Sequence, residues 1–155
     1  MDFPIFPDHE DPEETPFEMI CEDCAFSPPD AARTLTWLQS IAKSENIPWK
    51  SLSVIFCSDE YLRNLNAQYL QHDYYTDIVT FPYANDAIHG DMFVSIDRVA
   101  DNAQTLQQPF ERELRRVLAH GVLHLCGYAD ATPDQKALMR AKEDYWIQQA
   151  DAPDA

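Results

Sequence analysis

The sequence lacks both a long apolar run and a basic start. No stretch approaches the ~20 consecutive apolar residues that a transmembrane helix requires. The opening residues, Met1-Asp2-Phe3-Pro4-Ile5, carry neither the positive charge nor the apolar stretch of a signal peptide. We therefore expect a cytoplasmic protein that does not associate with membranes.

Cysteine is scarce and scattered. The 155 residues include only Cys21, Cys24, Cys57 and Cys126, which is too few for a disulfide framework, so we expect reduced thiols. Cys21 and Cys24 have the spacing of half a zinc knuckle or of a redox pair. No second pair follows them, however, and the acidic neighbours disfavour a thiolate. The sequence therefore argues against a metal or redox role for these two cysteines.

Positive charge is scarce as well. The 11 Lys and Arg residues face 27 Asp and Glu residues, which gives a formal net charge of -16. Because phosphate binding draws on Lys and Arg, the composition alone disfavours nucleic-acid binding. Much of the acidity is local, since no Lys or Arg precedes Arg33. Any RNA surface must be a modest basic patch, drawn from residues such as Arg63, Arg98, Arg112, Arg115, Arg116, Arg140 and Lys142.

The residues that are present suffice for one domain. A hydrophobic content of 45% and an aromatic content of 12% can supply one buried core. Residues 1–16 hold four prolines among acids and predict a loosely attached arm. We expect the domain to span residues 17–149 and a short tail to follow over residues 150–155.

Hydrophobic periodicity predicts a mixture of strands and helices. Strands are expected at residues 17–20, 51–57, 77–81 and 91–96, the last two forming a hairpin. Cap and proline signals predict helices that begin near residues 30, 58, 97, 110 and 133. The second half of the helix over residues 110–126 is apolar almost all round, apart from two histidines, and so belongs in the core. The last helix is expected to turn five side chains inward, namely Ala137, Leu138, Ala141, Tyr145 and Trp146.

The two histidines of that core helix have the spacing of metal ligands. His120 and His124 are four residues apart, so both imidazoles project from one helix face and can close on one ion. Gly127 is placed to end the helix, after which the chain can turn back and bring Asp130 to the same ion. Three protein ligands leave a fourth position for water, as in a catalytic zinc site.

The two histidines and Asp130 can also be explained without a metal ion. Buried histidines can be core residues that bond to the backbone, and an Asp before a capped helix is common turn chemistry. The zincin peptidase pattern places a Glu general base directly after the first histidine, where this chain has Gly121. A peptidase is therefore disfavoured, and Gly121 indicates close backbone packing.

The segment His120-Gly-Val-Leu-His-Leu-Cys-Gly-Tyr-Ala-Asp130 resembles the YbeY family motif His-Gly-x-Leu-His-Leu-x-Gly-Tyr-Asp-His. Two upstream stretches are similar to the same family: Leu65-Asn66 to Thr76-Asp-Ile-Val-Thr-Phe81, and Gly90-Asp-Met-Phe-Val-Ser95. The resemblance spans roughly residues 17–149. It implies an α+β fold in which a mixed sheet packs against helices, with a zincin-like metal helix.

The resemblance also implies an activity. It is that of a single-strand-specific, metal-dependent endoribonuclease that acts in 3′-end maturation of small-subunit ribosomal RNA and in ribosome quality control. The implied partners are ribosomal RNA and the small ribosomal subunit. The alternative hypothesis is a ribosome assembly or binding factor whose metal is structural and whose catalysis is weak or absent.

Two positions depart from the family pattern. The third histidine of the motif falls on Asp130, which leaves two imidazoles and a carboxylate; zinc is our first choice, and nickel, iron or manganese are alternatives. Leu70 stands where the family has an arginine, for which Arg98 or Arg116 could substitute. Asp77 and Asp91 could orient groups of the site, but strand-end capping explains them equally well, and we assign no catalytic residue.

Overall fold

The strands form one mixed sheet. The structure is a computed structural model that describes residues 16–71 and 75–151. Strands β1 (Phe17–Cys21), β2 (Trp49–Cys57), β4 (Ile88–Ser95) and β3 (Ile78–Pro82) lie side by side in that order. The first three run parallel, and β3 pairs antiparallel with β4. The α+β fold with a mixed sheet and the hairpin are therefore confirmed.

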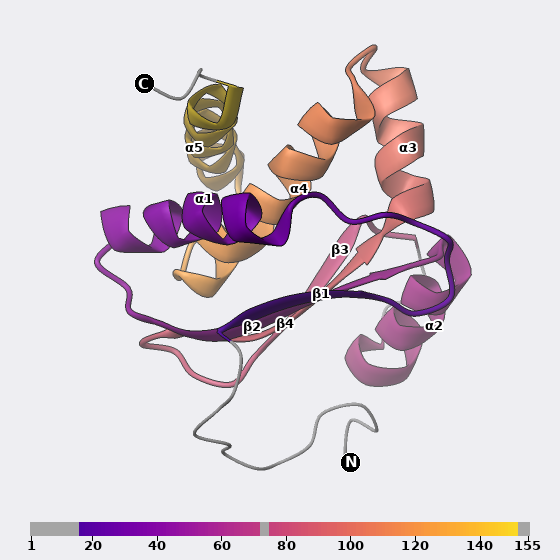
Figure 1. The fold of residues 1–155 in the computed structure, drawn as a ribbon, viewed down its shortest axis with the longest axis horizontal. Helices are drawn as coiled ribbons and strands as arrows, with labels where there is room; N and C mark the ends of the chain where they lie inside the picture. The colour runs from indigo at the N-terminus through magenta and orange to yellow at the C-terminus, as the bar shows by residue number, and fades with distance from the viewer. Residues whose placement is uncertain (1–15, 72–74, 152–155) are drawn as a thin grey trace.

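Within the described residues, five helices cover the two faces of this sheet unequally, as Figure 1 shows. Helices α1 (Ala31–Ser44), α3 (Ile96–Thr105), α4 (Phe110–Leu125) and α5 (Pro133–Asp151) lie on one side, and α2 (Asp59–Leu70) lies on the other. Each face of the sheet packs against its helices through a separate hydrophobic core, and the alternating side chains of β2 contribute to both. Leu52, Val54 and Phe56 face the four helices, whereas Ile55 and Cys57 face α2. Successive strand side chains point to opposite faces, so one strand can serve two cores.

Helix α4 lies at the centre of the larger core. Its buried residues include Leu114, Val117, Leu118 and Leu123, and apolar burial of this kind contributes roughly 25 cal/mol per Å². At Gly121 the helix approaches the sheet so closely that an added Cβ would lie 2.7 Å from atoms of Ile78 and Met92. Close packing at Gly121 is therefore confirmed, and it sets which face of α4 remains available for the histidines.

The predicted helix signals operate as expected. Asp30 and Ser58 cap α1 and α2 through their side chains. Thr132 and Gln135 form the reciprocal capping box before α5, with bonds of 3.1 Å and 3.0 Å. These caps satisfy backbone N–H groups that the first helical turn leaves without partners.

The inward face predicted for α5 is wrong at four of its five residues; only Trp146 is half-buried and packs against the core. Ala137, Leu138, Ala141 and Tyr145 are exposed, and the buried residues are Met139, Glu143 and Ile147. The buried face of α5 contains a carboxylate, Glu143, which a pattern of apolar residues does not place inside. The helix ends at Asp151, two residues into the predicted tail, and residues 152–155 lie outside the described residues.

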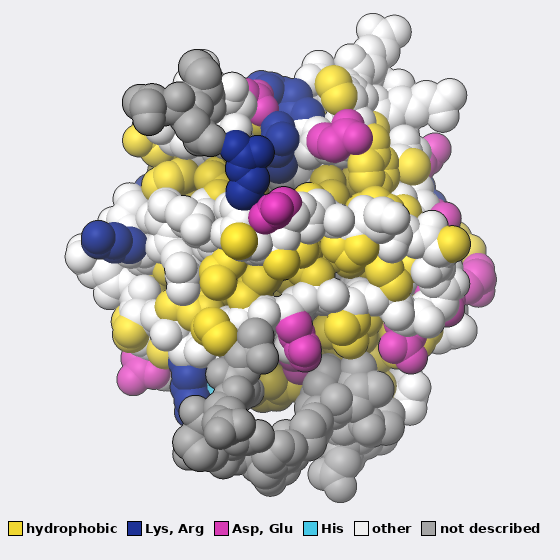
Figure 2. Space-filling view, in the orientation of Figure 1, with side chains coloured by type: hydrophobic (Ala, Val, Ile, Leu, Met, Phe, Trp, Pro, Cys, Tyr) yellow, Lys and Arg dark blue, Asp and Glu magenta, His cyan; other side chains and the backbone are white. Residues whose placement is uncertain are grey.

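The predicted arm lies outside the described residues except for Pro16. The Pro16 carbonyl accepts hydrogen bonds from the Trp49 indole at 2.8 Å and from the Leu52 amide at 3.0 Å. Among residues 16–71 and 75–151, no helix is long and apolar enough to cross a membrane. On the face shown in Figure 2, acidic side chains are dispersed, whereas the basic ones gather mainly where α1, α4 and α5 meet.

Candidate metal centre

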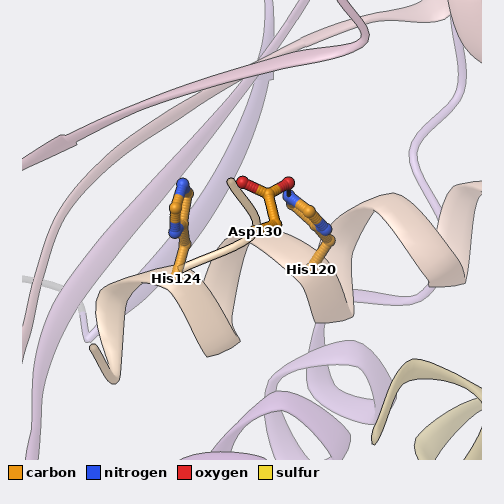
Figure 3. A group of neighbouring side chains, drawn as sticks. All are labelled: His120, His124 and Asp130. Atoms are coloured by element: carbon orange, nitrogen blue, oxygen red, sulfur yellow. Dashed lines mark ion pairs between the residues drawn. The ribbon is translucent and has the colours of Figure 1, made fainter. Parts of the chain in front are cut away.

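His120 and His124 project from the same side of α4, one turn apart, with the Asp130 carboxylate between them (Figure 3). The His120 ring is 22% exposed and the Asp130 side chain 42% exposed. His124 is exposed. The site therefore combines a half-buried imidazole with two side chains that solvent can reach.

The turn after α4 delivers Asp130. Gly127 has a φ of 109°, a left-handed conformation that strains other residues. This turn lets the Tyr128 amide donate to the Leu123 carbonyl at 3.1 Å, which is the backward bond of a Schellman-type helix end. The chain then doubles back over the last turn of the helix. The predicted glycine stop is confirmed, and it explains why a residue six positions after His124 reaches the same space.

Each histidine has its Nδ1 atom engaged by an oxygen. His120 Nδ1 lies 2.6 Å from Oε2 of Glu143. His124 Nδ1 lies 2.6 Å from the Tyr128 carbonyl oxygen, which can only accept a hydrogen bond. With Glu143 ionised, both neutral rings carry their proton on Nδ1, which leaves Nε2 of each ring available to a metal ion. Metal-binding histidines in proteins are held in this way by outer partners.

The three side chains lie close enough together that they could hold one divalent ion. Their ligand atoms all lie within 4.8 Å of one another, and His120 Nε2 is 3.3 Å from Asp130 Oδ2. Two ligands bonded to one tetrahedral zinc ion lie about 3.3–3.6 Å apart. Two imidazoles and a carboxylate are also the donor set of the facial triad that holds iron. The three residues that the sequence singled out are therefore together, in an arrangement able to hold a metal.

Carboxylates surround the half-buried His120 ring. Burial lowers the pKa of His120, but the hydrogen bond and charge of Glu143, with the charges of Asp130 and Asp77, outweigh it and raise this pKa. Burial also raises the pKa of the Asp77 carboxyl, against the attraction of the His120 ring. The site thus offers strong electrostatic compensation to a cation.

The two other acids considered from sequence have different surroundings. Asp77 precedes β3 and lies close enough to influence His120 electrostatically. Asp91, on β4, is buried and accepts a hydrogen bond from the Tyr83 hydroxyl. Neither acid belongs to the His120–His124–Asp130 group.

Sequence reasoning missed Glu143. This carboxylate is 4% exposed and bonds both His120 and Arg116. A signal was available, because Glu143 lies midway between Met139 and Ile147 at four-residue spacing. An acidic residue inside such an apolar stripe indicates a buried partner.

Neither arginine considered as a substitute for the family residue has a free head group. Arg98 bonds Asp59 at 2.7 Å and Asp101 at 2.9 Å. Arg116 bonds Glu143 at 3.0 Å and Asp144 at 2.6 Å. Leu70, the last residue of α2, is 40% exposed.

The surroundings of Cys24 disfavour its thiolate form. All four lie within the described residues and carry free thiols. Burial, followed by the neighbouring Cys21 and acidic side chains, raises the pKa of Cys24 to about 11. A protonated thiol is a poor nucleophile and a poor metal ligand.

A groove of about 700 Å³ lies apart from the histidines. It is bounded by the first half of α1, the first half of α4 and the end of α5, and its charged lining comprises Asp30, Arg33, Glu111 and Arg115. Its charges are balanced in sign, and none of the three grouped ligands lines it.

Comparisons of the chain with known proteins all point to one family. A family model described as endoribonuclease YbeY matches residues 26–151. A protein named endoribonuclease YbeY from Cytophaga hutchinsonii is 52% identical over 134 residues, which cover 85% of this chain and 93% of that protein. One of the same name from Amoebophilus asiaticus is 44% identical over 81% of this chain and 87% of its own.

A solved structure agrees with the fold. The solution structure of TM1509 from Thermotoga maritima matches with a TM-score of 0.58 and 26% identity. The match covers 86% of this chain and 88% of that chain. The similarity therefore extends over the sheet and the helices as well as the histidine segment.

Proposed function

The chain belongs to the endoribonuclease YbeY family, and on this premise we propose that it is a metal-dependent endoribonuclease that cleaves single-stranded RNA. The cellular task we propose is 3′-end maturation of small-subunit ribosomal RNA and ribosome quality control in the cytoplasm. Its partners would be ribosomal RNA and the small ribosomal subunit. The observation that carries the chemistry is the grouping of His120, His124 and Asp130 within 4.8 Å.

His120 and His124 would hold one divalent ion through Nε2, and Asp130 would hold it through its carboxylate. Zinc is our first choice, with nickel, iron or manganese as alternatives for this donor set. Such an ion supplies a Lewis acid and activates water for attack on a phosphodiester. The exposed side of His124 and Asp130 is the direction from which a phosphate can approach.

The environment of Gly121 argues against peptide hydrolysis. Zincin peptidases carry their Glu general base at the corresponding position. Here that position points at the sheet, where even an added Cβ would meet Ile78 and Met92 at 2.7 Å. A carboxylate has no room beside His120 on this side of α4. Phosphodiester cleavage does not require one, because the ion can both polarise the phosphate and activate water.

The negative charge of the chain favours a second function, that of a ribosome assembly factor. With a net charge of -16, and with Arg98 and Arg116 each bonded to two carboxylates, few cations are available for phosphate. These facts favour the alternative of a ribosome assembly factor whose metal is structural.

Three ligand variants test the proposal: His120→Ala, His124→Ala and Asp130→Ala. Purified wild type should contain near-stoichiometric metal by elemental analysis and should cleave a single-stranded RNA faster than the same sequence in a duplex. Each variant should lose metal, and its cleavage should fall to background, because three ligands are the minimum for a catalytic site. Asp134→Ala is the matched control, since Asp134 is an exposed acid four residues after Asp130.

The readouts separate the two functions. Cleavage that survives the loss of metal would contradict the assigned chemistry. Wild type that holds metal, binds the small ribosomal subunit and cleaves no RNA would support the assembly factor. Thermal unfolding of each variant shows whether a lost activity reflects a lost fold.

A further inference from the structure

Glu143 is a carboxylate in a place that favours apolar residues. It is 4% exposed and lies between Met139 at 2% and Ile147 at 0% on the buried face of α5. Moving a carboxylate out of water costs several kcal/mol unless it is paired and hydrogen-bonded. The two oxygens of Glu143 must therefore be engaged, and their partners indicate what the residue does.

The two oxygens bind different groups of α4. Oε1 accepts from Arg116 at 3.0 Å, and Oε2 lies 2.6 Å from Nδ1 of His120. An ionised carboxylate can only accept hydrogen bonds, so His120 must place its proton on Nδ1. The opposite nitrogen, Nε2, lies 3.3 Å from Oδ2 of Asp130, so that a proton or a metal ion between these two atoms would stabilise the pair.

The packing of α5 against α4 does not require the Glu143–His120 hydrogen bond. Arg112 and Arg115 both bond Asp151, and Arg116 also bonds Asp144, so three ion pairs already join α5 to α4. None of these pairs touches His120. The Glu143–His120 bond is therefore additional to the attachment of the helix.

The partners of the two histidines also differ in charge. His124 donates to the neutral carbonyl of Tyr128, whereas His120 is bonded to a buried carboxylate. A charged acceptor makes a stronger hydrogen bond and leaves more electron density on the ring. His120 is thus the better electron donor of the two rings.

We propose that Glu143 is a positioning residue of the metal centre: it fixes the tautomer and orientation of His120 and strengthens the bond of that ring to the ion. The inference rests on the proposed metal centre but not on the identity of the RNA substrate. Carboxylates that hold metal-binding histidines typically change metal affinity about 10- to 100-fold when they are removed.

The test compares Glu143→Gln with Asp144→Asn. Asp144 is the neighbouring acid, bonds the same arginine and does not touch His120, so its variant reproduces the loss of charge beside Arg116 alone. Zn²⁺ affinity is measured by competition with a chelator. Glu143→Gln should bind Zn²⁺ about 10- to 100-fold more weakly, and Asp144→Asn should remain within about twofold of wild type.

A second readout needs no metal. In the metal-free protein at alkaline pH, ¹⁵N NMR of the imidazoles should show His120 protonated at Nδ1 in wild type and in Asp144→Asn. A glutamine amide can donate or accept, so Glu143→Gln should show a mixture of tautomers. Glu143→Met, which keeps an apolar side chain at this buried position, should retain the fold and bind Zn²⁺ at least as weakly as Glu143→Gln.

The outcomes are distinguishable. Unchanged tautomer and affinity in a folded Glu143→Gln would overturn the inference and reduce Glu143 to an anchor of α5, while the metal centre would stand. Wild type that binds no Zn²⁺, Ni²⁺, Fe²⁺ or Mn²⁺ would overturn both the metal centre and the role of Glu143.

Discussion

Two buried carboxylates on neighbouring helices show how differently a single residue type can be used. Glu143 has two hydrogen-bonded partners. Glu113, which is 5% exposed in the first turn of α4, has both acidic and basic side chains near it. Burial raises the pKa of Glu113; Asp77 and Glu143 add to this effect, and Arg116 and Arg140 oppose it. This position therefore favours the neutral form of the Glu113 carboxyl more than water does.

The pH dependence of Glu113→Gln tests that balance. A carboxyl whose pKa is higher in the folded than in the unfolded chain stabilises the fold below the unfolded pKa, and this stabilisation is lost as pH rises through the folded pKa. Glutamine mimics the neutral acid at every pH. The free energy of unfolding of the variant, relative to wild type, should therefore rise between pH 4 and pH 8 in denaturant titrations. A difference independent of pH would contradict the burial effect, and Glu111→Gln, at an exposed position of the same turn, is the control.

At the scale of the element, the main feature of α4 is its close contact with the sheet at Gly121. Gly121 faces Ile78 and Met92 of the sheet, and the histidines occupy the side of the helix that this contact leaves available. In an exposed helix, Gly→Ala is stabilising by about 1 kcal/mol because alanine has the higher helix propensity. Here the added methyl group must displace an isoleucine terminus and a methionine thioether, so overpacking opposes that gain.

Gly121→Ala should lower the free energy of unfolding by about 1–3 kcal/mol, as overpacked cores do. Ile78→Val removes the Cδ1 atom that lies 2.7 Å from the added Cβ. The double variant should therefore be less destabilised than the sum of the two single variants, because residues in contact are not additive. Guanidinium unfolding of the four proteins measures this coupling. If the two changes in the free energy of unfolding simply add, then α4 moves away from the sheet in Gly121→Ala and the new methyl group does not press on Ile78.

At the scale of the whole molecule, charge is the property that opposes the proposed substrate. The chain carries -16 overall, and like charge slows the encounter with a polyanion. Residues 1–15 contribute six acids, Asp2, Asp8, Glu10, Asp11, Glu13 and Glu14, and no Lys or Arg. Removing these six negative charges from -16 leaves -10.

Deletion of residues 1–15 should therefore raise the affinity for single-stranded RNA severalfold at low salt, measured by fluorescence anisotropy. The gain should vanish near 1 M salt, where the screening length falls to about 3 Å. A full-length chain with the six acids changed to Asn or Gln should behave like the deletion. If only the deletion gains affinity, the length of the segment and not its charge is responsible.

The sequence by itself determined the features that lie within one element or one turn. The spacing of His120 and His124, the stop at Gly127 and the caps at Asp30, Ser58 and Thr132 all depend on neighbours a few residues away, and each has the predicted local structure. That His120, His124 and Asp130 bind a metal stays a prediction.

The tertiary structure alone decided which face α5 buries and what surrounds His120. Glu143 lies 23 residues from His120 and 27 from Arg116, so the spacing of Met139, Glu143 and Ile147 could indicate a buried acid but not which residues compensate its charge. The burial of a carboxylate is favourable only when distant partners meet it. Those partners come together through the packing of α5 against α4, which the pattern of a single helix does not contain.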